Sequence, residues 1–116
     1  MLENMARQLE ALGNETRLAA YRLLVRAGPG GLPVGGLQEA LGIPASTLSH
    51  HVHRLVVVGL VLQERHGTQL LCRANFVAMH GIIGFLSSQC CADMPAEPAS
   101  RQEPVVMGSS ATGARP

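Results

Sequence analysis

The sequence has no lysine and no tryptophan, and it contains only one tyrosine and two phenylalanines. So few aromatic side chains argue against binding of single-stranded nucleic acid, which depends on bases stacking on aromatic rings. All nine basic residues are arginines, and the formal net charge is only +1. With so low a charge, any binding of nucleic acid requires a local cluster of positive groups.

Long apolar runs and an export signal are also missing. The longest apolar run, residues 55 to 62, is too short to span a membrane. The first ten residues, MLENMARQLE, are charged and helix-forming, which is not typical of a signal peptide. We therefore expect a cytoplasmic protein without membrane contact, whose three cysteines stay reduced.

The length of 116 residues suits one domain with a single core. We expect this domain to occupy residues 1–92. Residues 93–116 are rich in proline, serine, alanine and glycine without periodicity, which predicts a disordered tail. The sequence has no glycine-rich phosphate loop, no paired carboxylates in an apolar setting and no nucleophile beside a base, so we do not expect an enzyme.

Apolar spacing predicts two helices at the start of the chain. The first is indicated by residues at 3-4-3 spacing: Leu2, Met5, Leu9 and Leu12. Gly13 ends this helix, and Asn14 is expected to cap a second one that runs to about Arg26. The second helix is expected to hold four residues inside: Leu18, Tyr21, Leu24 and Val25.

The rest of the domain is predicted as a helix-turn-helix followed by a hairpin and a last helix. A short helix fits residues 36–41, and a longer one begins at Pro44 or Ala45 and runs to about Val58. Two β-prone segments, 60–65 and 68–73, are joined at His66-Gly67. Asn75 is expected to cap a last helix that runs to about Cys91. The order ααααββα is mainly α with a β-hairpin wing, the winged helix-turn-helix class.

The fourth helix has one apolar and one polar face. Leu48, Val52 and Leu55 fall at i, i+4 and i+7 and are expected to face the core. The polar side carries candidate DNA-contacting residues: Ser46, Thr47, Ser49, His50, His53 and Arg54. Such groups suit base edges and phosphates in a major groove, although a merely solvated face is the alternative.

Two neighbouring features complete this predicted surface. His51 lies beside the buried stripe, and we interpret it as a structural residue bonded to a nearby backbone group. Arg65, His66 and Thr68 at the hairpin tip are expected to contact the DNA backbone or minor groove.

Several motifs together resemble the ArsR/SmtB family of metal-responsive repressors. They are NETRL at 14–18, the Leu37 to Ile43 segment, STLSHHVHRL at 46–55 and GLV at 59–61. The resemblance covers residues 2 to about 91, and it departs at Pro44, where the family often has a capping serine. It implies a winged-helix homodimer that binds operator DNA and releases it when an inducer binds.

Apolar spacing independently supports a homodimer through the first and last helices. The last helix carries an apolar stripe at 3-4-3-4 spacing: Phe76, Met79, Ile83, Leu86 and Cys90. With Leu2, Met5 and Leu9 of the first helix, this stripe is expected to form the dimer interface. The alternative is that the stripe packs only within its own subunit.

Cys90 and Cys91 form an adjacent pair at the end of the last helix. Thiolates select soft ions, but neighbouring helical residues point about 100° apart, so both sulfurs reach one centre only if the helix frays there. A vicinal disulfide and ordinary packing of Cys90 are the alternatives. Cys72 is a candidate third ligand, with a core role as its alternative.

The resemblance also bears on the inducer. The family's cysteine site in the third helix is absent, because the matching segment 32–37 reads LPVGGL. Other members resemble this chain in a C-terminal cysteine pair, which implies trivalent arsenic, As(III), as the inducer and favours an organoarsenical such as methylarsenite. We expect no obligatory cofactor. Alternatives are another soft ion, Sb(III), Cd(II) or Zn(II), thiol oxidation, or a winged-helix module for protein interaction without DNA binding.

Overall fold

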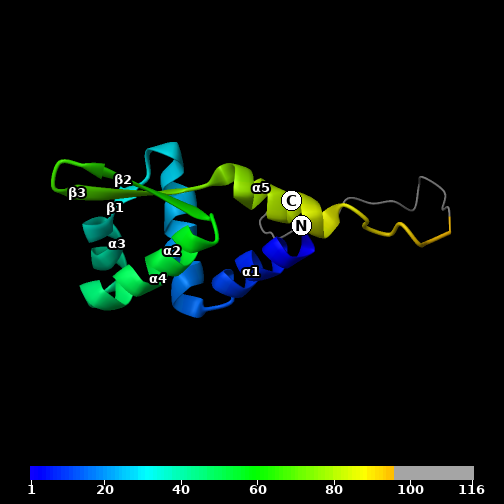
Figure 1. Cartoon of the computed structure of the whole chain (residues 1–116), viewed down its shortest axis with the longest axis horizontal. Helices are drawn as coiled ribbons and strands as arrows, with labels where there is room; N and C mark the ends of the chain where they lie inside the picture. Colours follow the sequence, from blue (N-terminus) through cyan, green and yellow to red (C-terminus); the bar gives the residue numbers. More distant parts are fainter. Residues whose placement is uncertain (96–116) are drawn as a thin grey trace, which may run out of the picture.

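The computed structural model describes residues 1–95. Its elements are α1 (Leu2–Leu12), α2 (Glu15–Ala27), the 3₁₀ turn η1 (Gly28–Gly30), β1 (Leu32–Pro33), α3 (Val34–Leu41), α4 (Ala45–Val57), β2 (Val61–His66), β3 (Gln69–Ala74) and α5 (Phe76–Ser87). In Figure 1, α1 and α5 lie side by side at one end of the molecule, and the β2–β3 hairpin projects at the other. The predicted winged helix-turn-helix order is confirmed. The predicted tail lies outside the described residues from position 96 onward.

Side-chain caps set the starts of two helices where the sequence predicts them. The Oδ1 atom of Asn14 accepts a hydrogen bond from the Arg17 amide at 3.0 Å, and α2 begins at the next residue. Asn75 caps α5 in the same way, through the Ala78 amide at 3.2 Å. Pro44 precedes α4 without a side-chain acceptor, because a proline at this place offers only its fixed backbone angle.

The sheet has the order β1-β3-β2 and is antiparallel throughout. His66 pairs with Gln69, so the hairpin turn is Gly67-Thr68, one residue later than predicted. Strand β1 is not predicted from the sequence, because two residues between a glycine-rich turn and a helix leave no alternation to detect. Its Leu32 pairs with Cys72 of β3.

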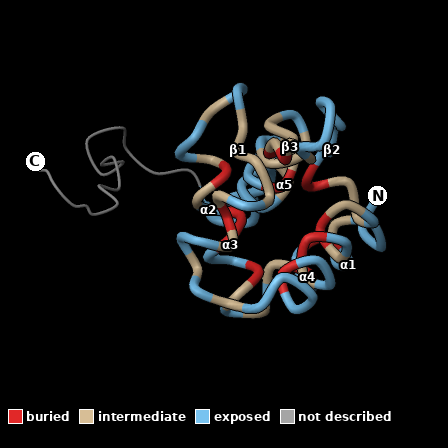
Figure 2. Tube along the Cα trace, turned by 90° about the vertical axis from the view of Figure 1, so that its left-hand side faces the viewer, coloured by how far each residue is buried: buried red, intermediate tan, exposed pale blue. Residues whose placement is uncertain are grey.

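The core lies where α2, α3, α4 and the sheet meet, and Figure 2 shows their buried segments facing a common centre. Its largest fully buried side chains are Leu24, Leu37, Leu48, Leu55, Leu60, Val52, Val61 and Cys72. Leu18 is a correction to the prediction, because its side chain is 44% exposed rather than inside. It occupies the side of α2 that faces an open groove instead of the core.

Helix α5 is shorter than predicted and ends at Ser87 instead of about Cys91. The Ser87 hydroxyl donates to the Ile83 carbonyl at 2.9 Å, and the Ser88 hydroxyl donates to the Phe85 carbonyl at 3.0 Å. Such back-bonding competes with continued helix. The following amides, including that of Cys90, then bond three residues back, which tightens the chain into successive turns.

Gly31 yields a test of the packing between η1 and β3. Its φ is +71°, and an added Cβ would collide with the Cys72 carbonyl oxygen. We expect Gly31→Ala to lower the free energy of unfolding by at least about 2 kcal/mol, from backbone strain plus overpacking. Gly30→Ala is the matched control, since its Cβ meets no atom within 4 Å. Equal urea midpoints for the two variants would contradict this reading.

Candidate nucleic-acid interface

Helix α4 divides its two faces as the sequence predicts. Leu48, Val52 and Leu55 are at most 2% exposed and anchor the helix on the core. The predicted contact residues on the other side are exposed: Ser46, Thr47, Ser49, His50 and His53. The fold therefore gathers small hydroxyls and imidazoles on one solvent-facing helix surface, the chemistry that base edges and phosphates require.

Arg54, predicted with that group, has a protein partner instead. Its Nη2 lies 2.8 Å from the Glu10 Oε1 of α1. Because both side chains remain partly exposed, this ion pair is worth at most about 1 kcal/mol. The pair occupies Nη2, so a contact between Arg54 and DNA competes with Glu10 or uses the remaining guanidinium donors.

His51 has a structural partner, but it is a side chain and not the backbone group that the sequence reading expects. Arg17 of α2 is 7% exposed, and its Nη1 lies 3.3 Å from His51 Nδ1. A guanidinium can only donate, so Nδ1 accepts and the imidazole proton sits on Nε2. Burial and then the Arg17 charge lower the pKa of His51, with smaller contributions from His50 and Arg54.

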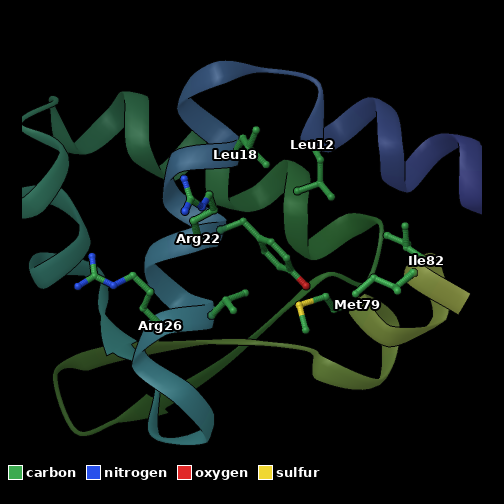
Figure 3. A pocket seen from close by; sticks show the side chains of 9 residues that line it. Leu12, Leu18, Arg22, Arg26, Met79 and Ile82 are labelled. Atoms are coloured by element: carbon green, nitrogen blue, oxygen red, sulfur yellow. The ribbon is translucent and has the colours of Figure 1, made fainter. Parts of the chain in front are cut away.

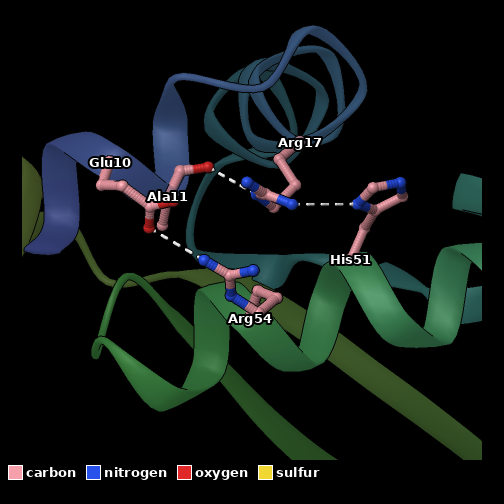
Figure 4. A network of polar contacts seen from close by, with 5 residues as sticks. All are labelled: Glu10, Ala11, Arg17, His51 and Arg54. Carbon is pink, nitrogen blue, oxygen red and sulfur yellow. Dashed lines mark hydrogen bonds and ion pairs between the residues drawn. The ribbon is translucent and has the colours of Figure 1, made fainter.

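Together these contacts fasten α1 to α4. Arg17 also donates through Nε to the Ala11 carbonyl at 2.6 Å, and Figure 4 shows it between the end of α1 and His51. Gln8 adds a further link by donating to the Val58 carbonyl at 3.0 Å. Sequence reasoning missed Gln8 and Arg17 as functional residues. The NETRL motif was the available signal for Arg17, but a polar residue in a helix carries no indication that it is buried.

The hairpin carries the predicted wing residues on its exposed surface. Arg65, His66 and Thr68 are all exposed. The carboxylate of Glu64 lies 3.4 Å from His66 Nε2 and 3.1 Å from Arg73 Nη2. This carboxylate offsets part of the wing's positive charge. Arg65 is the arginine of the wing that forms no ion pair with any of the described residues.

The cysteines separate into a pair and a core residue. The Cys90 and Cys91 sulfurs are exposed and 3.7 Å apart, because the pair follows the end of α5 and Cys91 has a φ of +60°. A hydrogen bond with Cys90, followed by its charge, raises the pKa of Cys91. Cys72 is fully buried in the core, which raises its pKa, and its sulfur accepts from Gln63 Nε2 at 3.6 Å. Residues 1–95 contain no group of three or more candidate metal-ligating side chains.

The residues predicted for a dimer interface are only partly covered within one chain. Leu2 is 70% exposed and Leu9 37%, while Ile83 is 55% and Leu86 63% exposed. Phe76 and Met79 are half-buried, as is Met5, which lies beside Gly81 and joins α1 to α5. Packing within the subunit therefore accounts for part of the stripe and leaves an apolar strip open. No helix in the described part of the chain is long and apolar enough to cross a membrane.

Comparisons with known proteins agree with this geometry. A family model described as a helix-turn-helix domain matches residues 12–64. An ArsR family transcriptional regulator of known structure is 20% identical, with a TM-score of 0.70, covering 83% of this chain and 97% of that one. The chain has the winged helix-turn-helix fold of ArsR-type transcriptional regulators.

Two further solved structures are similar. The transcriptional repressor BigR from Xylella fastidiosa is 27% identical, with a TM-score of 0.61, over 78% of this chain and 89% of that one. A homodimeric winged helix-turn-helix DNA-binding domain from Mycobacterium bovis is 24% identical, with a TM-score of 0.60, over 84% and 90%. No curated protein sequence matches the chain.

The Arg17–His51 contact predicts a specific pH response. Arg17→Met should raise the pKa of His51 toward its ordinary value, because a facing positive charge is removed while burial remains. In the native protein the lowered pKa means that the unfolded chain binds the proton first, so His51 makes stability fall as the pH drops below about 6.5. An NMR titration of the imidazole in the folded protein measures this pKa.

The control for this titration is Arg7→Met, which removes an exposed arginine of α1. It should leave the pKa of His51 where it is in the native protein. A pKa that is the same in Arg17→Met and Arg7→Met would refute the contact.

Proposed function

We propose that the protein is a transcriptional repressor. In this proposal it binds double-stranded operator DNA as a homodimer and releases it when a trivalent arsenical binds Cys90 and Cys91. The observation that carries the DNA-binding part is the division of α4, with an apolar face fixed in the core and exposed serines and histidines opposite. A helix held in this way in a helix-turn-helix can enter a major groove.

The DNA contacts have distinct roles in the proposal. Base edges are read from α4 by Ser46, Ser49, His50 and His53, while Thr47 at the margin of this face donates to phosphates. The wing adds backbone contacts from three residues at its exposed tip, Arg65, His66 and Thr68. The low net charge of the chain means that affinity depends on these local groups.

A homodimer supplies the second recognition helix. The exposed apolar side chains of Leu2, Ile83 and Leu86 favour burial against a second copy. A two-fold pair would place two α4 helices about 34 Å apart, one turn of DNA, and would require a pseudo-palindromic operator. The Mycobacterium bovis neighbour, described as homodimeric, supports the same arrangement.

The geometry of the thiol pair supports the proposed inducer. Two exposed sulfurs 3.7 Å apart suit a trivalent arsenical that already carries one organic group, such as methylarsenite. Binding of inorganic arsenite by three sulfurs needs a further thiol, either an external one or Cys72, whose burial in the core disfavours it in that role. The same exposed pair also suits Sb(III), Cd(II), Zn(II) or thiol oxidation as the signal.

A chain of contacts connects the thiol pair with α4. The pair directly follows α5, α5 meets α1 at Met5 and Gly81, and Glu10 of α1 pairs with Arg54 of α4. An inducer releases DNA only if it binds the DNA-free arrangement more tightly. Drawing the end of α5 around the arsenic atom would shift α1 and thereby the separation of the two recognition helices.

DNA recognition is tested on duplexes selected by the protein from a random library. His50→Ala and Ser49→Ala should each weaken binding by about fivefold to 100-fold, the range for loss of a base contact. His80→Ala, which removes an exposed histidine of α5, should leave affinity unchanged. Gel shifts measure the affinity of the native protein and of each variant at two salt concentrations, and all affinities should fall as the salt concentration rises. Equal affinities for all three variants would exclude α4 as the reading element.

Induction is tested by titrating the DNA complex with methylarsenite and arsenite. Methylarsenite should release the native protein at lower concentration, and Cys90→Ser or Cys91→Ser should abolish release because one thiolate cannot hold the arsenical. Cys72→Ala is the matched control and should still respond to methylarsenite. Normal release from both serine variants would eliminate the pair as the sensor, while leaving DNA binding intact as a separate result.

A further inference from the structure

An apolar groove separate from the cysteine pair lies between α2 and α5. Its volume is about 370 Å³. It is lined by Leu12, Leu18, Tyr21, Arg22, Val25, Arg26, Met79, Ile82 and Ile83. Figure 3 shows Arg22 and Arg26 of α2 toward one end, and Met79 and Ile82 of α5 toward the other. This volume falls at the lower end of the range for small-molecule sites.

The groove wall contains a buried polar group without a partner. Tyr21 is only 4% exposed, and its hydroxyl forms no hydrogen bond within the described structure. An unpaired buried hydroxyl is costly, so native proteins nearly always satisfy it. Burial raises the pKa of Tyr21, which keeps the hydroxyl protonated and able to donate.

Two arginines place positive charge at the same groove. Arg22 and Arg26 are one helical turn apart on α2, and both are exposed. Neither forms an ion pair with any residue in the range 1–95. A guanidinium pair at this spacing suits a carboxylate or sulfonate, since each side chain can donate to its oxygens.

We propose that this groove binds a small amphipathic organic anion. The apolar body of the ligand packs between Leu18 and Ile82, and its anionic group lies at Arg22 and Arg26. An oxygen of the ligand accepts the Tyr21 hydroxyl. This site is independent of the arsenical proposal, and a ligand there would contact α2 and α5 at once.

A second copy of the chain is the competing occupant, because Met79 and Ile83 line the groove and also belong to the predicted dimer stripe. The unpaired charges favour the anion. A partner's apolar helix side chains would cover Ile83 without satisfying the Tyr21 hydroxyl or the arginines.

The experiment uses the full chain with 1-anilinonaphthalene-8-sulfonate as a fluorescent anionic probe. Octanoate and octan-1-ol, which have the same apolar length, are the competitors. Octanoate should displace the probe at a concentration at least about tenfold lower than octanol, because charge-assisted hydrogen bonds add to apolar burial. The double variant Arg22→Gln/Arg26→Gln should remove that difference. Tyr21→Phe should weaken binding of 8-hydroxyoctanoate, whose distal hydroxyl can accept from Tyr21, by about threefold to tenfold, and should leave octanoate binding unchanged.

The controls separate this site from general surface binding. Arg7→Gln/Arg65→Gln removes the same charge from α1 and the wing and should bind octanoate as the native protein does. Circular dichroism melting curves check that each variant is folded. Equal competition by octanoate and octanol, or loss of the difference in the control variant, overturns the proposal. Octanoate affinity that falls with rising protein concentration, as dimers form, assigns the groove to a second copy and also overturns it.

Discussion

The buried guanidinium of Arg17 is the interaction on which the arrangement of the helices around α4 depends. It starts from α2, donates to the Ala11 carbonyl at the end of α1 and faces His51 of α4. Arginine cannot lose its charge at accessible pH, so burying it is costly unless its donors are matched. Its two acceptors therefore constrain three helices at one point, and a displacement of α1 strains the contact with α4.

This constraint gives the proposed dimer contact at α1 a route to the proposed DNA contact at α4. α4 is anchored twice, by Leu48, Val52 and Leu55 in the core and by polar contacts to α1. The core contacts are non-directional, whereas the hydrogen bonds at 2.6 to 3.3 Å depend on the distance and angle between their atoms. The polar contacts thus transmit orientation, and the apolar ones supply most of the stability.

Much of the fold and part of the candidate site could be predicted because the signals are local. The caps at Asn14 and Asn75 and the apolar period of α4 depend on neighbours within four residues. The predicted end of α5 lies about four residues too late. Serine hydroxyls bond to backbone carbonyls there and compete with helix formation, and apolar periodicity carries no signal of this competition. Strand β1 and the exposure of Leu18 depend on elements distant in sequence.

The sequence by itself determined the order of the elements, the apolar face of α4 and the chemical nature of its polar face, because side-chain period and capping act over a single turn. Only the tertiary structure decided that Arg54 pairs with Glu10, that His51 faces Arg17, and that the Cys90 and Cys91 sulfurs lie 3.7 Å apart. Those outcomes depend on which helices meet and on where α5 ends. A charged or polar residue has the same local pattern whether it faces solvent, DNA or another helix.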